Sequence, residues 1–344
     1  MRSLRWPAAG IGCLITLAAT GCAGQDGQDG QARTVPSVTA APGTPARTGS
    51  GTSYAPYVSA GKAAPTDAAG SPTTYNLAFV IADGDDCVPS WDGSHAIGDP
   101  GITSRIAKLE EGGGRVRVSF GGAHGRELAA SCDSVPELAT AYGKALDAAG
   151  TPLADFDIEG DELGDSASIA RRSKAIARLQ EERPGLQVSF TLPVMPKGLG
   201  KDSLALLASA NSHAVRVSTV NLMTMNYGSS YDGDMGDYAL TAAEAAHTQL
   251  QKTFKTPDAS TWRGMALTSM IGVNDVEGET FTLADAAEVR AFAEEKGIAW
   301  VSMWSTARDR QCAHGTESAR AGKAATDCSG VAQKPGAFAE AFTG

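Results

Sequence analysis

Three carboxylic acids alternate with apolar residues in one short run of the chain. Asp155, Asp157 and Glu159 occur in Leu-Ala-Asp-Phe-Asp-Ile-Glu-Gly, positions 153–160. A period of two is typical of a β-strand, so the acids are expected on one face, roughly 6.6 Å from neighbour to neighbour. Because close carboxylates repel one another and burial disfavours ionisation, one of them is expected to hold a proton and serve as an acid.

The acidic run also fits two other interpretations. A strand edge can carry a solvated acidic face, and acidic clusters often bind calcium. Calcium loops place Gly and Asn turns between their ligands, whereas bulky apolar residues separate these acids. The choice between catalysis, ion binding and a solvated face therefore depends on the rest of the chain.

Short apolar runs alternate with helical patterns along most of the chain. The runs typical of strands are Ala55–Ser59, Tyr75–Ala82, Arg115–Phe120, Leu153–Glu159, Gln187–Leu192, Ser218–Met225, Met265–Ile271 and Ala299–Ser305. The amphipathic segments typical of helices are Ile102–Glu111, Val135–Ala149, Ser166–Glu182, Asp202–Ala210, Leu240–Phe254 and Leu283–Lys296, followed by a short Pro335–Phe342 helix. The Gly-, Pro- and Ala-rich segment between the first two strands fits a helix least well.

This alternation predicts an α/β fold with a parallel sheet, and eight units predict a closed (β/α)8 TIM barrel. On the helix expected at Ser166–Glu182, the basic residues Arg171, Arg172 and Lys174 are expected to form a solvated face.

Residues that could bind a ligand follow the ends of several predicted strands, and in a barrel these carboxyl ends meet at one mouth. The residues expected there beside the acids are Ser119, Gly121, Gly122, Met223, Met225, Asn226, Tyr227, Asn274, Asp275 and Trp304. Trp91, expected in the loop after the second strand, is a candidate outer platform, with packing inside the loop as the alternative. An acidic cleft with an aromatic floor suits a sugar, which stacks on a ring and hydrogen-bonds around its rim.

From about Tyr54 to the C-terminus the chain resembles glycoside hydrolase family 18, the chitinases and related endo-N-acetylglucosaminidases. The resemblance rests on the acidic run, Ser119-Phe-Gly-Gly122, Ala78-Phe-Val and Met223-Thr-Met-Asn-Tyr-Gly228, in the order of a bacterial and archaeal branch of the family. It implies a TIM barrel that hydrolyses β-1,4-linked N-acetylglucosamine polymers.

The resemblance also implies roles for individual residues. Glu159 is the implied general acid/base, Asp157 orients the substrate N-acetyl group, and Asp155 supports Asp157 electrostatically. Trp304 is the implied floor for the sugar at the scissile bond. The family is substrate-assisted, so the acetamido oxygen is the nucleophile and the anomeric configuration is retained. The like charge of Asp157 is expected to raise the pKa of Glu159, and burial is expected to add to this rise.

Three positions depart from the usual family pattern. Pro152 stands where an Asp usually precedes Asp155 by three residues, Met225 replaces a Tyr that binds the acetamido carbonyl, and Asn226 replaces an acid. Two alternatives to a chitinase therefore stay open. One is an endo-β-N-acetylglucosaminidase acting on N-glycans. The other is a chitooligosaccharide-binding lipoprotein without turnover. A monomer without cofactor or metal is expected.

The N-terminus is typical of an export signal. Arg2 and Arg5 precede the apolar stretch Ile11–Ala19, which is too short to span a membrane. Small residues before Cys22 resemble a lipobox, so residues 1–21 are expected to be removed and Cys22 to carry lipid. Ordinary secretion with cleavage nearby is the alternative.

Residues 22–51 have almost no large apolar side chains and are expected to form a flexible tether before a catalytic domain at 52–344. The formal net charge is −10, and removal of residues 1–21 makes it −12. An acidic exported chain without basic clusters is not expected to bind nucleic acid. Its only expected membrane contact is the lipid anchor.

Four cysteines remain beyond Cys13 and Cys22. An even number outside the cytoplasm predicts disulfides, which we expect to join Cys87 to Cys132 and Cys312 to Cys328. A zinc site is the alternative, but no pair has CxxC spacing and the five His are scattered.

Overall fold

The computed structural model describes residues 51–314 and 324–344, all within one compact unit, residues 49–344. The predicted signal segment, Cys22 and nearly all of the predicted tether lie outside the described residues. Among the described residues, no helix has both the length and the apolar character needed to cross a membrane.

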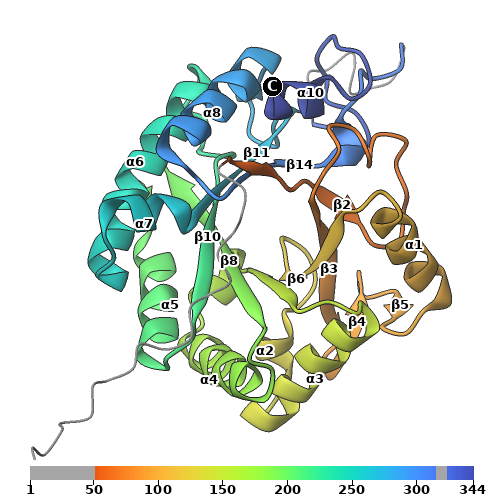
Figure 1. The fold of residues 1–344 in the computed structure, drawn as a ribbon, viewed down its shortest axis with the longest axis vertical. Helices are drawn as coiled ribbons and strands as arrows, with labels where there is room; N and C mark the ends of the chain where they lie inside the picture. The colour runs from red at the N-terminus through yellow and green to blue at the C-terminus, as the bar shows by residue number, and fades with distance from the viewer. Residues whose placement is uncertain (1–50, 315–323) are drawn as a thin grey trace, which may run out of the picture. The chain divides into compact units, whose positions relative to one another are not determined.

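A barrel of parallel strands forms the centre of this unit (Figure 1). Its wall contains β1 (Ser53–Tyr54), β2 (Tyr57–Ser59), β3 (Thr74–Asp83), β6 (Arg115–Gly121), β7 (Leu153–Asp157), β8 (Gln187–Met195), β10 (Val217–Met223), β11 (Met265–Met270) and β14 (Trp300–Trp304). Neighbouring strands pair in the order β3–β6–β7–β8–β10–β11–β14. The predicted (β/α)8 TIM barrel is confirmed.

The first strand closes the barrel in two halves. β1 pairs with β14, whereas β2 pairs with β3. Pro56 lies between the halves and has no N–H to donate, so it suits the point where the strand changes partners. Ala55 N still donates to Val301 O (3.0 Å), and Pro56 O accepts from Asn76 N (2.9 Å). Both edges of the sheet are thereby joined.

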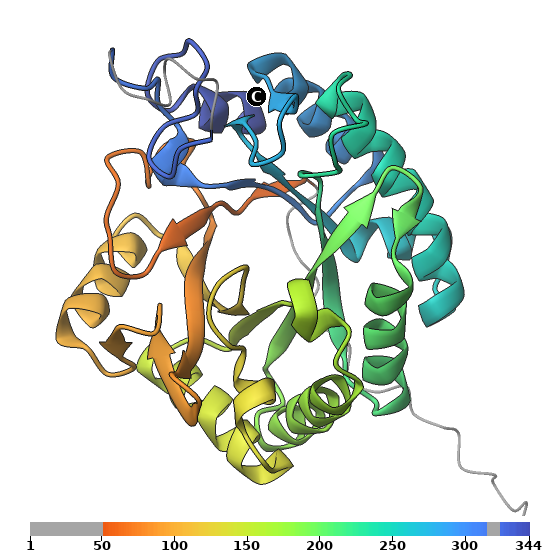
Figure 2. The same cartoon turned by 180° about the vertical axis from the view of Figure 1, so that it is seen from behind.

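Helices surround the barrel, as the view from behind also shows (Figure 2). The longer ones are α1 (Pro100–Glu110), α3 (Val135–Ala148), α4 (Ser166–Glu182), α5 (Lys201–Ser212), α6 (Met235–Phe254), α8 (Leu283–Lys296) and the final α10 (Ala337–Thr343). Short additions are α2 (Leu128–Ser131), α7 (Asp258–Arg263), η1 (Gly160–Leu163) and η2 (Thr306–Arg308). Residues 60–73, which connect β2 to β3, form no helix, as the Gly-, Pro- and Ala-rich composition of this segment predicts.

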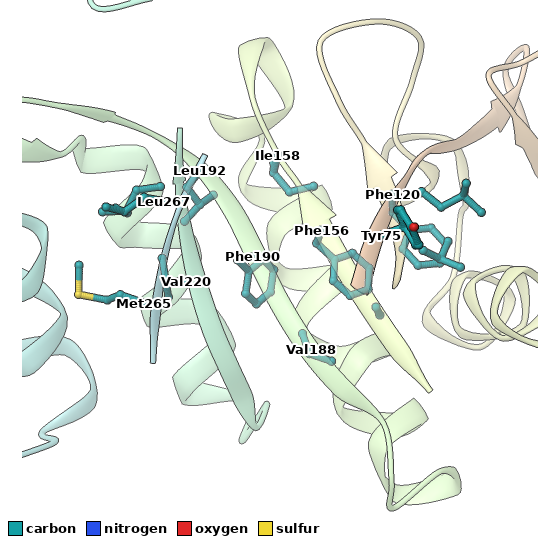
Figure 3. Packing of buried hydrophobic residues seen from close by; sticks show 14 of the residues in the cluster. Tyr75, Phe120, Phe156, Ile158, Val188, Phe190, Leu192, Val220, Met265 and Leu267 are labelled. Atoms are coloured by element: carbon teal, nitrogen blue, oxygen red, sulfur yellow. The ribbon is translucent and has the colours of Figure 1, made fainter. Parts of the chain in front are cut away.

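The core between sheet and helices confirms the alternation predicted for the acidic run. Phe120, Phe156 and Phe190 pair in register on β6, β7 and β8 and form a row on the helix side (Figure 3). The ring centroids lie 5.1 Å apart for Phe120–Phe156 and 5.7 Å for Phe156–Phe190. Tyr142 of α3 packs edge-on against Phe120 and Phe156. The residues on either side of Phe156 along β7, including Asp155, therefore face the barrel interior.

Two expectations about exposed side chains are wrong. Trp91 lies on β4 (Asp86–Trp91), which pairs antiparallel with β3, and its side chain is completely buried with Nε1 donating to Ile97 O (3.1 Å). It cannot be an outer sugar platform. Arg172 on α4 is 1% exposed and donates a hydrogen bond to the buried Glu127, so it is not part of the expected solvated face. Arg171 is partly buried, and Lys174 is exposed.

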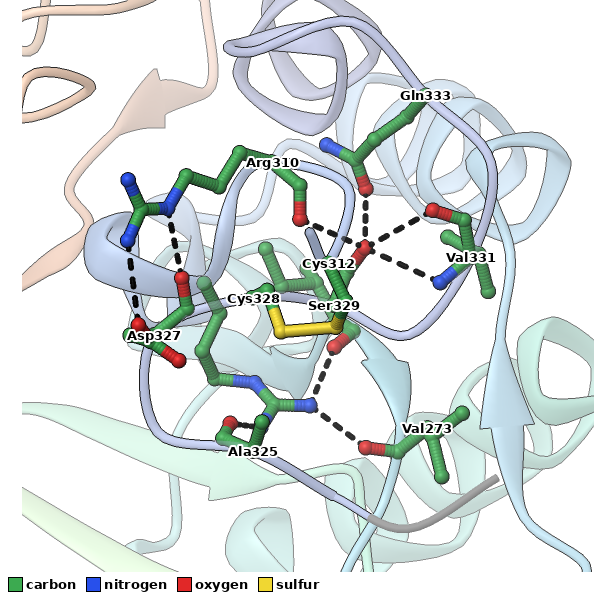
Figure 4. The surroundings of a disulfide bond; sticks show 11 residues. Val273, Arg310, Cys312, Ala325, Asp327, Cys328, Ser329, Val331 and Gln333 are labelled. Atoms are coloured by element: carbon green, nitrogen blue, oxygen red, sulfur yellow. Dashed lines mark hydrogen bonds and ion pairs between the residues drawn. A yellow bond between two sulfur atoms is a disulfide. The ribbon is translucent and has the colours of Figure 1, made fainter. Parts of the chain in front are cut away.

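Both predicted disulfides are confirmed. Cys87 of β4 bonds to Cys132 at the end of α2, and Cys312 bonds to Cys328 in the segment before α10 (Figure 4). The alternative of a zinc site at these thiols is therefore wrong. The pairs lie in segments that follow β3, β6 and β14; β3 and β6 are neighbours in the wall, and the first strand, β1 and β2, separates β3 from β14.

Candidate active site

Asp155 lies inside the barrel and is 1% exposed. Its Oδ2 accepts hydrogen bonds from the hydroxyls of Tyr57 (3.0 Å) and Ser119 (2.7 Å). Its Oδ1 accepts from Ser189 (2.6 Å) and Thr191 (2.9 Å). The donors come from β2, β6 and β8. Each carboxylate oxygen thus receives two hydrogen bonds, which satisfies a group that is expensive to bury without partners.

This network continues across two more strands. Asn221 of β10 donates from Nδ2 to Thr191 Oγ1 (3.0 Å), and Thr268 of β11 donates to Asn221 Oδ1 (2.9 Å). Neighbouring strands therefore hold Asp155 in one orientation. Sequence reasoning identified Ser119 here but missed Tyr57, Thr191, Ser189, Asn221 and Thr268.

Asp157 lies at the carboxyl end of β7 and is 5% exposed. Among the residues that the structure describes, its Oδ1 has no hydrogen-bond partner. Burial raises the pKa of this carboxyl well above its ordinary value, and the negative charges of Glu159 and then Asp155 raise it further. Asp157 therefore retains a proton to higher pH than an ordinary Asp, and one oxygen is placed to accept a hydrogen bond from a ligand.

The glycines after Ser119-Phe120 are required by close approach. Gly121 has φ +96°, and a Cβ there would lie 2.2 Å from the backbone oxygen of Asp157. Gly122 has φ +90°, donates its N–H to the same oxygen (2.9 Å), and would place a Cβ 2.8 Å from the ring of Phe79. A side chain at either position would displace the acid or the aromatic ring beside it.

Glu159 follows two residues after β7 ends, at the N-cap of η1. Its backbone is extended (φ −144°, ψ 178°), so the predicted strand conformation continues past the last ladder bond. The side chain is partly buried. Burial raises its pKa, and the nearby His124 opposes this rise.

Burial is the leading cause of the raised pKa for both groups, ahead of the like charge that is expected to lead from the sequence. The repulsion between the two carboxylates is mutual and acts on the pair. Because two close carboxyls resist ionising together, protonation of the two is linked.

An aromatic cluster faces these acids. Trp304 ends β14 and is partly exposed, and its ring stacks on Phe79 with centroids 5.5 Å apart. Tyr57 packs edge-on against Trp304 (5.8 Å) and tilted against Phe79 (6.1 Å). One tyrosine thus contacts both the aromatic floor and, through its hydroxyl, Asp155.

Two cavities flank this centre. One of about 580 Å³ adjoins Glu159 and is lined by Gly122, Ala123, Gly125, Arg126, Ala130, Gly160, Asp161, Glu162 and Asp165. The other, of about 290 Å³, is lined by Trp304 and Phe79 and lies at the ends of β2 and β14 and beside the middle of β3. A ligand crossing the mouth can therefore pass from the aromatic pair to Glu159 and find space on both sides.

The loop after β10 carries the next predicted group. Met223 is partly buried, and Met225 and Tyr227 are buried. The Tyr227 hydroxyl has no hydrogen-bond partner within the described ranges, and burial together with the charge of Glu279 raises its pKa. Asn226 is exposed with φ +55°, a conformation that Asn tolerates better than most residues. Its Oδ1 accepts from the backbone N–H of Asp275 (3.1 Å), itself exposed.

Two residues predicted to contact a ligand make structural hydrogen bonds. Ser119 is fully buried and donates to Asp155. Asn274 is buried, and its Nδ2 donates to the carbonyls of Met270 (2.8 Å) and Gly272 (2.9 Å). The prediction that the Ser119 side chain touches substrate directly is therefore wrong, because it is fully buried, whereas Asn274 Oδ1 has no hydrogen-bond partner among the described residues.

A metal has one candidate location within the described ranges. The exposed acids Asp234, Asp237 and Glu288, on or beside α6 and α8, bring carboxylate oxygens within reach of one ion. They are separate residues from the acids of β7 and do not take part in that site.

A TIM barrel with linked, buried carboxyls and an aromatic floor at its mouth is the arrangement of a glycoside hydrolase. Comparison with models of protein families finds none that matches. The chain is 35% identical over 286 residues to a protein of Escherichia coli (strain K12) described as a probable bifunctional chitinase/lysozyme, covering 78% of this chain and 32% of that one. Endochitinase 11 of Metarhizium anisopliae is 35% identical over 248 residues, 68% of this chain and 47% of that one.

Solved structures agree with these relatives. The catalytic domain of a hyperthermophilic chitinase from Pyrococcus furiosus is 30% identical with a TM-score of 0.74, covering 84% of this chain and 93% of that one. Catalytic-site mutants of active domain 2 of the thermostable chitinase from the same organism, solved with chito-oligosaccharides, are 29% identical with a TM-score of 0.75 over 84% and 92% of the two chains. The chain belongs to glycoside hydrolase family 18, the chitinases. It spans about a third and about half of the two curated relatives.

Proposed function

We propose that this protein hydrolyses β-1,4-linked N-acetylglucosamine polymers or oligomers, with Glu159 as general acid/base and the substrate acetamido group as nucleophile. The observation that carries the proposal is the buried, unpartnered Oδ1 of Asp157 beside Glu159. Family membership and the relatives named chitinase support the reaction class.

In the proposed reaction one N-acetylglucosamine ring stacks on Trp304. Glu159 gives its proton to the glycosidic oxygen, and the bond from that oxygen to the anomeric carbon breaks. The acetamido oxygen forms a bond to the same carbon, while the acetamido N–H donates to Asp157. Water then adds to the anomeric carbon as the acetamido oxygen leaves, and Glu159 takes up the water proton. General acid help of this kind contributes roughly 10²–10⁴-fold in rate.

Asp155 acts through Asp157 in this scheme. The hydroxyl network fixes Asp155 below Asp157, and its charge raises the pKa of Asp157. As positive charge grows on the acetamido nitrogen, ionisation of Asp157 becomes more favourable. The proton that Asp157 releases can then be held by Glu159, the other member of the linked pair.

Release of a chromogenic aglycone from a chitobioside tests the proposal. Glu159→Gln removes the transferable proton with little change in shape, so we expect hydrolysis to fall by about 10²–10⁴-fold with binding largely kept. Hydrolysis at the parent rate by Glu159→Gln would contradict the catalytic role. Binding without hydrolysis by the parent would favour the sugar-binding alternative, and trimming of a high-mannose glycoprotein in preference to chitin oligomers would favour the N-glycan alternative.

We also propose that the protein is exported and anchored by lipid on Cys22. Two disulfides support folding in an oxidising compartment. In cells that make the full chain, Cys22→Ala should move the protein from the membrane fraction to the medium. Continued membrane association of that variant would contradict the anchor.

A further inference from the structure

Two short segments flank the cavity beside Glu159. We call residues 122–127 the β6 loop and residues 157–162, which begin at the last residue of β7, the β7 loop. Both line the cavity of about 580 Å³. At the start of the two loops, Gly122 N donates to Asp157 O (2.9 Å). Because Glu159 lies two residues beyond this bond, the bond holds the acid from one side only.

A second bond joins the far ends of the same loops. Glu127 N donates to Glu162 Oε1 (2.7 Å). The interval between the two bonds is the same in both loops, from 122 to 127 in one and from 157 to 162 in the other. The two loops and the two bonds therefore form a closed ring that contains Glu159. Every link of this ring is backbone except the side chain of Glu162.

The β6 loop is the fixed side of the ring. Ala82 N of β3 donates to Arg126 O (2.9 Å). The Glu127 side chain is buried and accepts from Arg172 Nη2 (2.7 Å) and Ala129 N (2.9 Å). These contacts tie the β6 loop to β3, α2 and α4. The position of the Glu127 N–H is therefore set by the wall and the helices, and it does not depend on the β7 loop.

The β7 loop leaves the wall directly before Glu159. Ile158 is completely buried, and its N–H donates to Thr191 O (3.1 Å). Gly160 is exposed and has no side chain that could hold the loop. In the described chain the Glu159 side chain makes no capping bond to η1. The position of the Glu159 carboxyl therefore depends on the anchors on either side of it, Ile158 and Glu162.

We propose that Glu162 is a positioning residue for the reaction, because by accepting the Glu127 N–H it holds the β7 loop against the β6 loop and keeps the Glu159 carboxyl directed at the glycosidic oxygen. The inference rests on the proposed function for the role of Glu159. Glu162 acts through the backbone and needs only an acceptor oxygen at this place. Misplacing a catalytic group by about 1 Å can cost on the order of 10²-fold in rate.

The charges around Glu162 favour an acceptor over a net charge as its contribution. Burial raises the pKa of Glu162, and the bond from Glu127 N lowers it. The charge of Glu127 raises this pKa, whereas those of Arg172 and then Arg126 lower it. A glutamine amide oxygen can accept the same N–H without the repulsion from Glu127. Glu162→Gln is therefore expected to keep the bond, and Glu162→Ala to lose it.

Hydrolysis of 4-nitrophenyl chitobioside separates these variants. Glu162→Ala should lower kcat about 10- to 100-fold while KM changes less than about threefold, because the acid is misplaced and the rest of the cleft is intact. Glu162→Gln should keep at least about a third of the parent kcat, since the acceptor remains. Glu181→Ala removes an exposed acid at the far end of α4 and should leave kcat within about twofold of the parent.

The pH profile distinguishes loss of position from loss of charge. Burial raises the pKa of Glu159, so a β7 loop that separates from the β6 loop and admits water should lower this pKa towards its ordinary value. Glu159 must be protonated to act as an acid. The alkaline limb of the kcat/KM profile should therefore move to lower pH in Glu162→Ala and stay in place in Glu162→Gln. The charged neighbours Asp157, His124, Arg126, Asp161 and Asp165 are the same in both variants.

Amide hydrogen exchange reports on the bond without turnover. In the peptide that contains Glu127, exchange should be about 5- to 10-fold faster in Glu162→Ala than in the parent, and unchanged in Glu162→Gln. Parent-like kcat in Glu162→Ala, or equal losses of kcat in both variants, would overturn the positioning role. An inactive parent would instead overturn the proposed function, because the exchange rates do not require hydrolysis.

Discussion

Loss of Arg172 is expected to destabilise the protein strongly, because its charge partner is fully buried. Nε and Nη2 of Arg172 donate to Glu127 Oε2 at 3.0 and 2.7 Å. The two side chains are 1% and 0% exposed. Tyr142 OH donates to Glu127 Oε1, and Ala129 N donates to Oε2 (2.9 Å). In the described part of the chain the carboxylate thus has two further partners, both neutral, and no second cation.

Arg172→Met keeps most of the apolar stem and leaves Glu127 buried with the two neutral donors. Removing one partner of a buried ion pair costs about 3–5 kcal/mol. At about 2 °C per kcal/mol, the lower end for a domain of this size, the melting temperature should fall about 6–10 °C. Arg172→Met combined with Glu127→Gln should recover part of this loss, because the uncompensated charge is gone.

Thermal unfolding followed by circular dichroism measures these changes. Lys174→Met on the exposed side of the same helix is the control, and it should shift the melting temperature by about 1 °C or less. The reasoning is refuted if Arg172→Met unfolds at the temperature of the Lys174→Met control, or if the double variant is less stable than Arg172→Met.

Two variants of the acids give further predictions. Folding raises the pKa of Asp157, so its stabilising contribution is complete below the unfolded value of about 3.9 and is lost as pH rises towards the folded pKa. Asp157→Asn should therefore nearly abolish chitobioside hydrolysis and yet melt at higher temperature than the parent at pH 7, with the difference vanishing near pH 4. Asp155→Asn removes one charge that raises the pKa of Asp157, so the alkaline limb of the kcat/KM profile should move to lower pH, and identical profiles would contradict this coupling.

Local patterns in the sequence predicted the scaffold well. Each predicted strand has a counterpart in the barrel wall, because a buried parallel strand is a short apolar run between turns. Helix ends were harder to predict. α6 begins at Met235 rather than Leu240, because the Asp234 side chain caps it by accepting from Asp237 N (3.0 Å).

Residues that act through distant partners could not be predicted. Tyr57 and Asp155 are 98 positions apart, and no local pattern places a β2 hydroxyl on a β7 carboxylate. Ser189 and Thr191 did leave a signal, since they alternate along β8 as the acids do along β7, but the register that makes them neighbours is visible only in the folded barrel. Arg172 looked like surface charge because Glu127, its partner, lies 45 positions away.

Trp91 shows the limit of reading a loop from composition. It follows Pro89-Ser90 in a segment rich in Gly and Asp, which is typical of an exposed loop. The segment instead forms a hairpin with β3, and Val80 pairs with Trp91. Pairing with a strand that is already part of the wall buries the ring, and this depends on contacts that the segment itself does not specify.

The stereochemistry of the first product tests the proposed mechanism most directly. Early-time NMR of the hydrolysis of a short chitin oligomer distinguishes the two anomers before they interconvert. If the acetamido group is the nucleophile, water enters from the side that the leaving sugar vacated, and the β anomer must appear first. If the α anomer appears first, water attacks directly, and the roles proposed for Asp157 and Glu159 are wrong.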